Sequence, residues 1–263
     1  MLAELLFWPT LVLYAEAALA FAGNARYPGL AGKLATWGVR LGWLFHTALL
    51  IEQVVKADGF AWTSWAGSLS LFVWLVAAAY LVWGCKPKYR LLGLVVMPLV
   101  TAMLLAAWAG GGTGTHTPSG GSTAFLVLHV AFVLVAFAGF TMSACLAGLY
   151  LWQERALKRR QVGVLRHLAP SLVTLETLVT RTILVGLPCL TVGIVTGLIR
   201  LNRDGARVDA LMIVTMLTWA VYAAFVLLRF EAGWRGRRAA KLALVGFALV
   251  LVVRLALPVA HFS

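Results

Sequence analysis

Long apolar runs alternate with short polar links along the whole chain, and this pattern predicts membrane-spanning helices. A helix needs roughly 20 apolar residues to cross the hydrocarbon core of a bilayer. Eight runs come close to that length or exceed it, at 2–22, 37–55, 64–84, 91–109, 122–152, 172–199, 210–229 and 239–258. We therefore expect eight transmembrane helices.

The predicted fold class is an all-α integral membrane protein. Backbone amides in lipid must be hydrogen-bonded within their own segment, and the runs are too long and continuous for the alternating strands of a barrel. Most links are too short to fold alone, so residues 1–263 are expected to form a single transmembrane domain. The first run carries Glu4 and Glu16 and lacks a basic leading segment and a small-residue cleavage site, which indicates a retained helix.

The composition excludes an ordinary soluble protein. Hydrophobic residues make up 62% of the chain and the mean hydropathy is +0.92. Only 22 basic and 9 acidic side chains are available. They are too few to cover a water-facing surface of normal size, so the lipid bilayer is the expected surroundings.

The basic residues are distributed unevenly, and this predicts the orientation. Sixteen Lys and Arg residues lie around the links after the first, third, fifth and seventh runs, against four in the other links. Cytoplasmic loops carry such an excess, so we expect these four links inside, both termini outside, and a multi-pass protein of the plasma (inner) membrane. The net charge of +13 then marks orientation, and no nucleic acid is expected as a partner. Anionic lipid binding by residues 155–166 is an alternative use of the same charge.

Several reaction classes lack their motifs in this sequence. Cys85, Cys145 and Cys189 lie within or at the end of apolar runs and form no CxxC pair, so thiol redox chemistry is not expected. There is no CxxCH motif for covalent attachment of haem. The sequence also shows no paired external carboxylates, no nucleophile with a base and no phosphate loop, so no catalytic residues are predicted.

Ionisable side chains inside the apolar runs are the candidates for function. A charge in hydrocarbon costs several kcal/mol unless it is paired or hydrated. Six side chains meet this description, namely Glu16, His46, His129, Glu176, Arg181 and His261.

The depths of the histidines suggest one shared site at the outer face. His129 lies seven residues into its run, roughly 10 Å below the outer edge, and His261 lies just outside the end of the last run. His46 is deeper, roughly 15 Å from the edge. Two neutral imidazoles are good axial ligands for haem iron, so His129 and His261 are the predicted metal ligands, with His46 a further candidate for the pocket. The alternative is that each histidine only hydrogen-bonds a neighbouring helix.

Arg181 needs a partner near the middle of its run. Glu176 is five residues away, about 140° around the helix, so the two side chains are not expected to pair with each other. A haem propionate is one candidate partner. A structural ion pair with Glu16 or Glu52 of a neighbouring helix is the other.

The second half of the chain resembles a known family. The stretches that carry the resemblance are Leu128-His129-Val130, Leu175-Glu176 through Arg181, Gly186-Leu187-Pro188, Leu190-Thr191, Gly193, Asp209, Leu217-Thr218-Trp219, Tyr222-Ala223-Ala224, residues 233–240 (GWRGRRAA) and residues 257–261 (LPVAH). Residues 46–74 match more loosely. On these motifs the chain resembles the cytochrome c assembly membrane proteins of the CcsA/CcmC/HemX group.

The resemblance implies a role in haem handling. Such proteins are thought to bind haem at the outer face and present it to apocytochrome c, with two histidines that flank a tryptophan-rich segment. The corresponding histidines here are His129 and His261. The family pattern WGxxWxWD is replaced here by residues 200–209, which keep only the final Asp209, and Leu227 stands where many CcsA proteins have an intramembrane histidine.

The sequence thus predicts a membrane protein of cytochrome c biogenesis that binds or relays non-covalent haem and works with other assembly proteins. Predicted cofactor-binding residues are His129, His261, His46, Arg181 and Asp209. Because the tryptophan motif is missing, full cytochrome c synthase activity by this chain alone is not expected. Two alternatives remain: a HemX-like regulatory scaffold that stabilises partner enzymes without haem, and a small-solute transporter, which the scarcity of buried charges disfavours.

Overall fold

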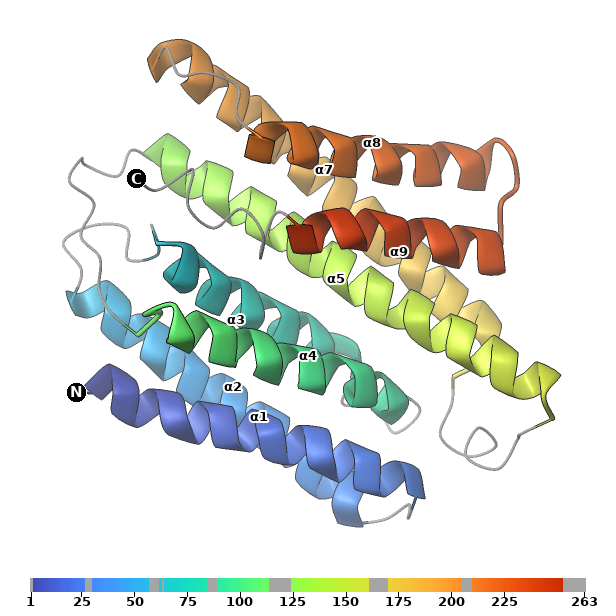
Figure 1. Cartoon of the computed structure of the whole chain (residues 1–263), viewed down its shortest axis with the longest axis horizontal. Helices are drawn as coiled ribbons and strands as arrows, with labels where there is room; N and C mark the ends of the chain where they lie inside the picture. The colour runs from blue at the N-terminus through green and yellow to red at the C-terminus, as the bar shows by residue number, and fades with distance from the viewer. Residues whose placement is uncertain are drawn as a thin grey trace. The chain divides into compact units, whose positions relative to one another are not determined.

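The computed structural model describes residues 2–26, 30–56, 62, 64–84, 89–113, 124–160, 170–204 and 210–252, and nearly all of them are helical (Figure 1). The all-α prediction is confirmed for this part of the chain. The helices are α1 (Leu2–Arg26), α2 (Leu30–Lys56), α3 (Trp65–Gly84), α4 (Arg90–Ala109), α5 (Ala124–Lys158), α7 (Leu172–Asp204), α8 (Ala210–Phe230) and α9 (Arg237–Leu251).

Seven of the described helices, α1 to α5, α7 and α8, are long and apolar enough to cross a membrane. The eighth predicted span, 239–258, is described as α9 for 15 residues up to Leu251, and its remainder lies outside the described residues. Several helices extend beyond their apolar runs: α2 begins at Leu30 and α5 continues to Lys158. Helical backbone bonds form within the segment, so a helix can continue into the polar headgroup region.

The described residues form two compact units. The first contains α1 to α4 and the C-terminal end of α5, and the second contains α5 up to Trp152 together with α7, α8 and α9. In the first unit α1 packs against α2 and α4, and α3 packs against the same two helices. Each of these four helices therefore has two neighbours.

Small residues allow the helices of the first unit to approach closely. A Cβ atom at Gly42 of α2 would lie 2.8 Å from the ring of Tyr14 on α1. A Cβ atom at Gly93 of α4 would lie 2.5 Å from Phe21 of α1 and 2.6 Å from the hydroxyl of Tyr80 on α3. In a bilayer, close van der Waals packing of this kind drives helix association, because lipid tails are as apolar as the side chains.

A stacked aromatic pair lies at the centre of the second unit. The rings of Phe140 on α5 and Tyr222 on α8 have centroids 3.7 Å apart, and the Tyr222 hydroxyl donates a 3.2 Å hydrogen bond to the Ala243 carbonyl of α9. Gly186 of α7 and Gly246 of α9 make room for these rings, because a Cβ at either position would lie within 2.8 Å of them. The pair thus connects all four helices of this unit.

The GWRG sequence between α8 and α9 forms a turn that explains its two glycines. Gly233 has φ 64° and Gly236 has φ 62°. Residues with a Cβ rarely adopt such positive φ values. Within the turn the Trp234 amide donates a 2.9 Å hydrogen bond to the Leu228 carbonyl. The Arg229 guanidinium donates a 3.4 Å bond to the Trp234 carbonyl. The turn therefore holds the end of α8 in a defined conformation.

Candidate functional site

His129 projects from α5 onto a glycine-lined stretch of α7. Its Nδ1 atom lies 2.7 Å from the carbonyl oxygen of Gly193 and 3.4 Å from the hydroxyl of Thr196. A Cβ atom at Gly197 would lie only 2.8 Å from His129 Cε1. The imidazole is half-buried, and it occupies space that any larger residue at position 197 would fill. This contact lies near the end of α7 that the sequence predicts to face outward.

The hydrogen bond to Gly193 determines the tautomer of the neutral His129 ring. A carbonyl oxygen can only accept, so Nδ1 must carry the hydrogen and Nε2 must carry the lone pair. Histidines that bind metals typically donate their other ring N–H to a carbonyl or carboxylate, which fixes the ring orientation and raises the basicity of the ligating nitrogen. The environment of His129 therefore fits an axial ligand of haem iron.

His46 lies in the other unit, in the core formed by α1 to α4. Its side chain has no solvent exposure, and its Nε2 lies 3.1 Å from the hydroxyl of Ser70 on α3. The ring of Tyr14 packs edge-on against it, with 6.0 Å between centroids. Nδ1 of His46 has no hydrogen-bond partner among the described residues. Direct ligation by His46 would require this packing to open, whereas His129 is already partly accessible.

Arg181 lies on an exposed part of α7, far along that helix from Gly193, the residue that His129 contacts. Twelve residues separate it from Gly193, which is roughly 18 Å at 1.5 Å per residue. A group held at His129 is thus not expected to reach Arg181. Of the two acidic residues considered as partners of Arg181, Glu52 forms an ion pair with Lys56 one turn along α2 in the first unit.

Glu176 of α7 and Arg229 of α8 form an ion pair that was not expected from the sequence. The side chain of Glu176 is 19% exposed and that of Arg229 is 16% exposed, so the ion pair is largely buried. A signal for it was present in the sequence: Glu176 lies four residues after the start of its run and Arg229 is the last residue of the next one. Consecutive antiparallel helices bring such positions to the same depth.

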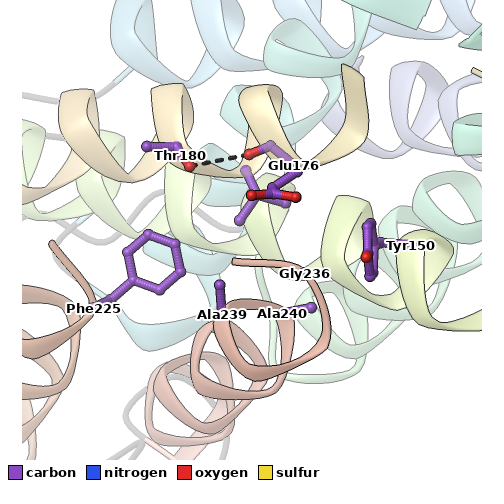
Figure 2. Close-up of a pocket in the computed structure, with 8 residues that line it drawn as sticks. Tyr150, Glu176, Thr180, Phe225, Gly236, Ala239 and Ala240 are labelled. Carbon is purple, nitrogen blue, oxygen red and sulfur yellow. Dashed lines mark hydrogen bonds between the residues drawn. The ribbon is translucent and has the colours of Figure 1, made fainter. Parts of the chain in front are cut away.

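A small cavity lies beside this ion pair, lined by residues from α5, α7, α8 and α9 (Figure 2). The labelled residues around it include Glu176 of α7, Tyr150 of α5 and Phe225 of α8, and the Thr180 hydroxyl donates a 3.0 Å hydrogen bond to the Glu176 carbonyl. Its volume is about 10 Å³, which is room for about one water molecule. The cavity is therefore too small for a porphyrin.

Two predicted site residues, His261 and Asp209, lie outside the described residues. The remaining three fall in different surroundings: His129 at the contact of α5 with α7, His46 in the core of the other unit, and Arg181 on the surface of α7. Among the described parts of the chain, no group of three or more His, Cys, Asp or Glu side chains is placed to hold a metal ion. Within this part, His129 is the candidate whose geometry best suits iron.

The chain is similar to known proteins over most of its length. A family model described as "Cytochrome C assembly protein" matches residues 62–260. The cytochrome c biogenesis protein CcsA of Microcystis aeruginosa is 27% identical, and the alignment covers 94% of this chain and 89% of that protein. The CcsA protein of Gloeothece citriformis is also 27% identical, with 83% and 82% covered. That of Prochlorococcus marinus subsp. pastoris is 32% identical over 49% of this chain and 48% of its own length.

These matches confirm the resemblance found in the motifs of the second half. The family model begins at Trp62 in the first unit and covers α5, α7, α8 and α9 in the second. It includes His129, the ion pair of Glu176 with Arg229 and the GWRG turn. Since the match spans well over half of the sequence, the chain belongs to the cytochrome c assembly protein family.

Proposed function

We propose that this membrane protein acts in cytochrome c biogenesis by binding or relaying haem at the outer membrane face, with His129 as an iron ligand. The observation that carries the proposal is the Nδ1 hydrogen bond of His129 to the Gly193 carbonyl, which leaves the lone pair on Nε2. The family membership and the CcsA relatives support the biological setting. His261 is proposed as the second ligand, Asp209 as a further contact, and the plasma (inner) membrane as the location.

In this proposal the protein binds and orients, and it carries out no acid or base step. The imidazole of His129 would hold the haem through its iron, and the iron would supply the coordination bond. The carbonyl of Gly193 holds the imidazole of His129 in one tautomer and one orientation. The close packing of α5 against α7 keeps the ring in place, since a Cβ at Gly193 would lie 2.6 Å from Val133.

Haem reconstitution tests the proposal. We expect the purified full-length protein, supplemented with haem, to show a haem-specific optical band that His129→Gly weakens strongly. Added imidazole should restore the band in that variant, because a small ligand can occupy the space of the missing side chain. His167→Ala removes a histidine from the predicted cytoplasmic link between residues 158 and 170 and serves as the matched control.

Two results would contradict haem binding at this site. A band that persists unchanged in the His129→Ala/His261→Ala double variant would assign the iron to other ligands. The absence of any band in the wild type after haem supplementation would favour the alternative function, a HemX-like scaffold that stabilises partner enzymes. In that case, loss of the protein should lower the amount of the partner enzymes while haem remains unbound to this chain.

A further inference from the structure

An open pocket lies where α7 meets the end of α8 and the link to α9. Its lining comes from three segments: Thr177, Thr180 and Arg181 of α7, Arg229 and Phe230 of α8, and Gly233 and Arg235 of the link. Its volume is about 310 Å³, at the lower end of the range of roughly 300–1,000 Å³ that is typical of ligand pockets. Three arginine side chains therefore converge on one hollow of the second unit.

The pocket has an excess of positive charge. Glu176 neutralises Arg229, which also donates a hydrogen bond to the Trp234 carbonyl. Arg181 and Arg235 are exposed, and the ion pairs found among the described residues include neither of them. Their guanidinium groups are suited to bidentate contact with an oxyanion.

The position of Arg181 favours a ligand from the lipid headgroup region. It lies nine residues after the start of α7, about 13 Å along the helix, where an uncompensated charge in hydrocarbon is costly. The pocket gives the Arg181 side chain a polar environment, and Arg235 lines the same pocket. Arg235 belongs to the link between α8 and α9, which the distribution of basic residues predicts to lie on the cytoplasmic side. Basic pockets between transmembrane helices on that side bind the headgroups of anionic lipids.

Apolar side chains near the pocket distinguish a lipid from a small soluble anion. Leu227 and Phe230 of α8 are each 63% exposed, and Val185, one turn after Arg181 on α7, is 65% exposed. Such surfaces can pack against acyl chains. The GWRG turn, held by the two glycines of positive φ, forms one wall of the pocket before any ligand arrives.

From these observations we propose that the pocket formed by Arg181, Arg229 and Arg235 binds the phosphate group of an anionic phospholipid of the cytoplasmic leaflet. The site is separate from His129, and it does not depend on haem. It also gives a role to Gly233 and Arg235 of the GWRG turn, which the haem site does not use. The ligand chemistry is a phosphate oxyanion, and free phosphate is the other source of such a group.

Native mass spectrometry of the purified full-length protein tests this proposal. The protein is mixed with equal amounts of phosphatidylglycerol and phosphatidylcholine that have the same acyl chains. We expect the wild type to retain phosphatidylglycerol preferentially, and Arg181→Gln/Arg235→Gln to lose that preference by about tenfold or more, because two charge-assisted contacts are removed. Arg237→Gln, an exposed site that does not line the pocket, should change retention by less than about twofold.

Competition by inorganic phosphate at matched ionic strength separates the two sources. If inorganic phosphate leaves the retention of phosphatidylglycerol unchanged, the ligand of the pocket is the lipid. If phosphatidylglycerol is not preferred but phosphate raises the melting temperature of the wild type and not of the double variant, the pocket binds phosphate from solution. The lipid proposal is overturned by that result, by the absence of both effects, or by a double variant that behaves as the wild type. It is also overturned if haem displaces the lipid, because the pocket then binds carboxylates. Circular dichroism checks the fold, and Arg235→Gln alone replaces the double variant if that variant does not fold.

Discussion

Glu176 of α7 and Arg229 of α8 form an ion pair across 53 residues of sequence, with both side chains less than one-fifth exposed. Removal of one partner leaves a largely buried charge without its counterion, which is usually more costly than removal of both. The pair also determines the charge of the neighbouring pocket, because it neutralises one of the three arginines there. The ion pair therefore contributes both to the stability of the second unit and to the net charge of the pocket.

We expect Glu176→Gln to destabilise the protein by about 1–3 kcal/mol, because Arg229 is left without its counterion at a site that is not fully buried. The double variant Glu176→Gln/Arg229→Gln should cost clearly less than the sum of the two single changes. SDS-induced unfolding in mixed micelles, followed by circular dichroism, measures these free energies. Strict additivity would show that the two side chains do not interact in the folded protein.

Gly197→Ala is expected to weaken haem binding without removing any ligand. Its Cβ would lie 2.8 Å from Cε1 and 3.2 Å from Nδ1 of His129, so the imidazole has to rotate away from the Gly193 carbonyl. Changes in the groups that orient a metal ligand typically lower affinity by roughly 10- to 100-fold, which haem titration can measure. Gly148→Ala on α5 is the control, since its Cβ meets nothing within 4 Å. Equal affinity in both variants would remove His129 from the iron site.

Gly93→Ala should destabilise the first unit by about 1–3 kcal/mol, as is usual for over-packed cores. The new Cβ would lie 2.5 Å from Phe21 and 2.6 Å from the Tyr80 hydroxyl, and both rings are fixed by packing. Gly23→Ala on α1 is the matched control, because it also replaces a helical glycine but meets nothing within 4 Å. Thermal melting followed by circular dichroism should place Gly93→Ala below the wild type and Gly23→Ala at or above it.

At Gly233 the conformation, and not the available space, should decide which substitutions are tolerated. Its φ is 64°, and a Cβ there meets nothing within 4 Å. Asn adopts positive φ more readily than a β-branched residue, so Gly233→Asn should cost less than Gly233→Val by about 1 kcal/mol. Unfolding in SDS measures the difference. Equal effects of the two substitutions would mean that the turn has changed its conformation.

The orientation predicted from the basic residues can be tested by cysteine labelling. On a background with Cys85, Cys145 and Cys189 replaced by alanine, a cysteine at Asn202 should react with an impermeant maleimide in intact cells. A cysteine at Lys158 should react only after the membrane is permeabilised. The reverse pattern would place the four basic links outside and contradict the proposed cytoplasmic position of the arginine pocket.

The sequence alone determined the class of fold and the family. Runs of about 20 apolar residues can satisfy their backbone amides in lipid only as helices, so the positions of the helices follow from composition. The motifs around His129, Arg181 and residues 233–240 were sufficient to indicate the family, which the match over residues 62–260 confirms. These features depend on local sequence, and they need no knowledge of which helices touch.

Only the tertiary structure decided how the polar side chains in the spans are used. The sequence left the partner of Arg181 open, and the structure pairs Glu176 with Arg229 and places Arg181 in a pocket with Arg235. It also gives His129 and His46 different surroundings, which hydrophobicity could not distinguish. The physical reason is that helix contacts in lipid depend on the shapes of facing surfaces and on single hydrogen bonds, and these become visible only when the helices are packed.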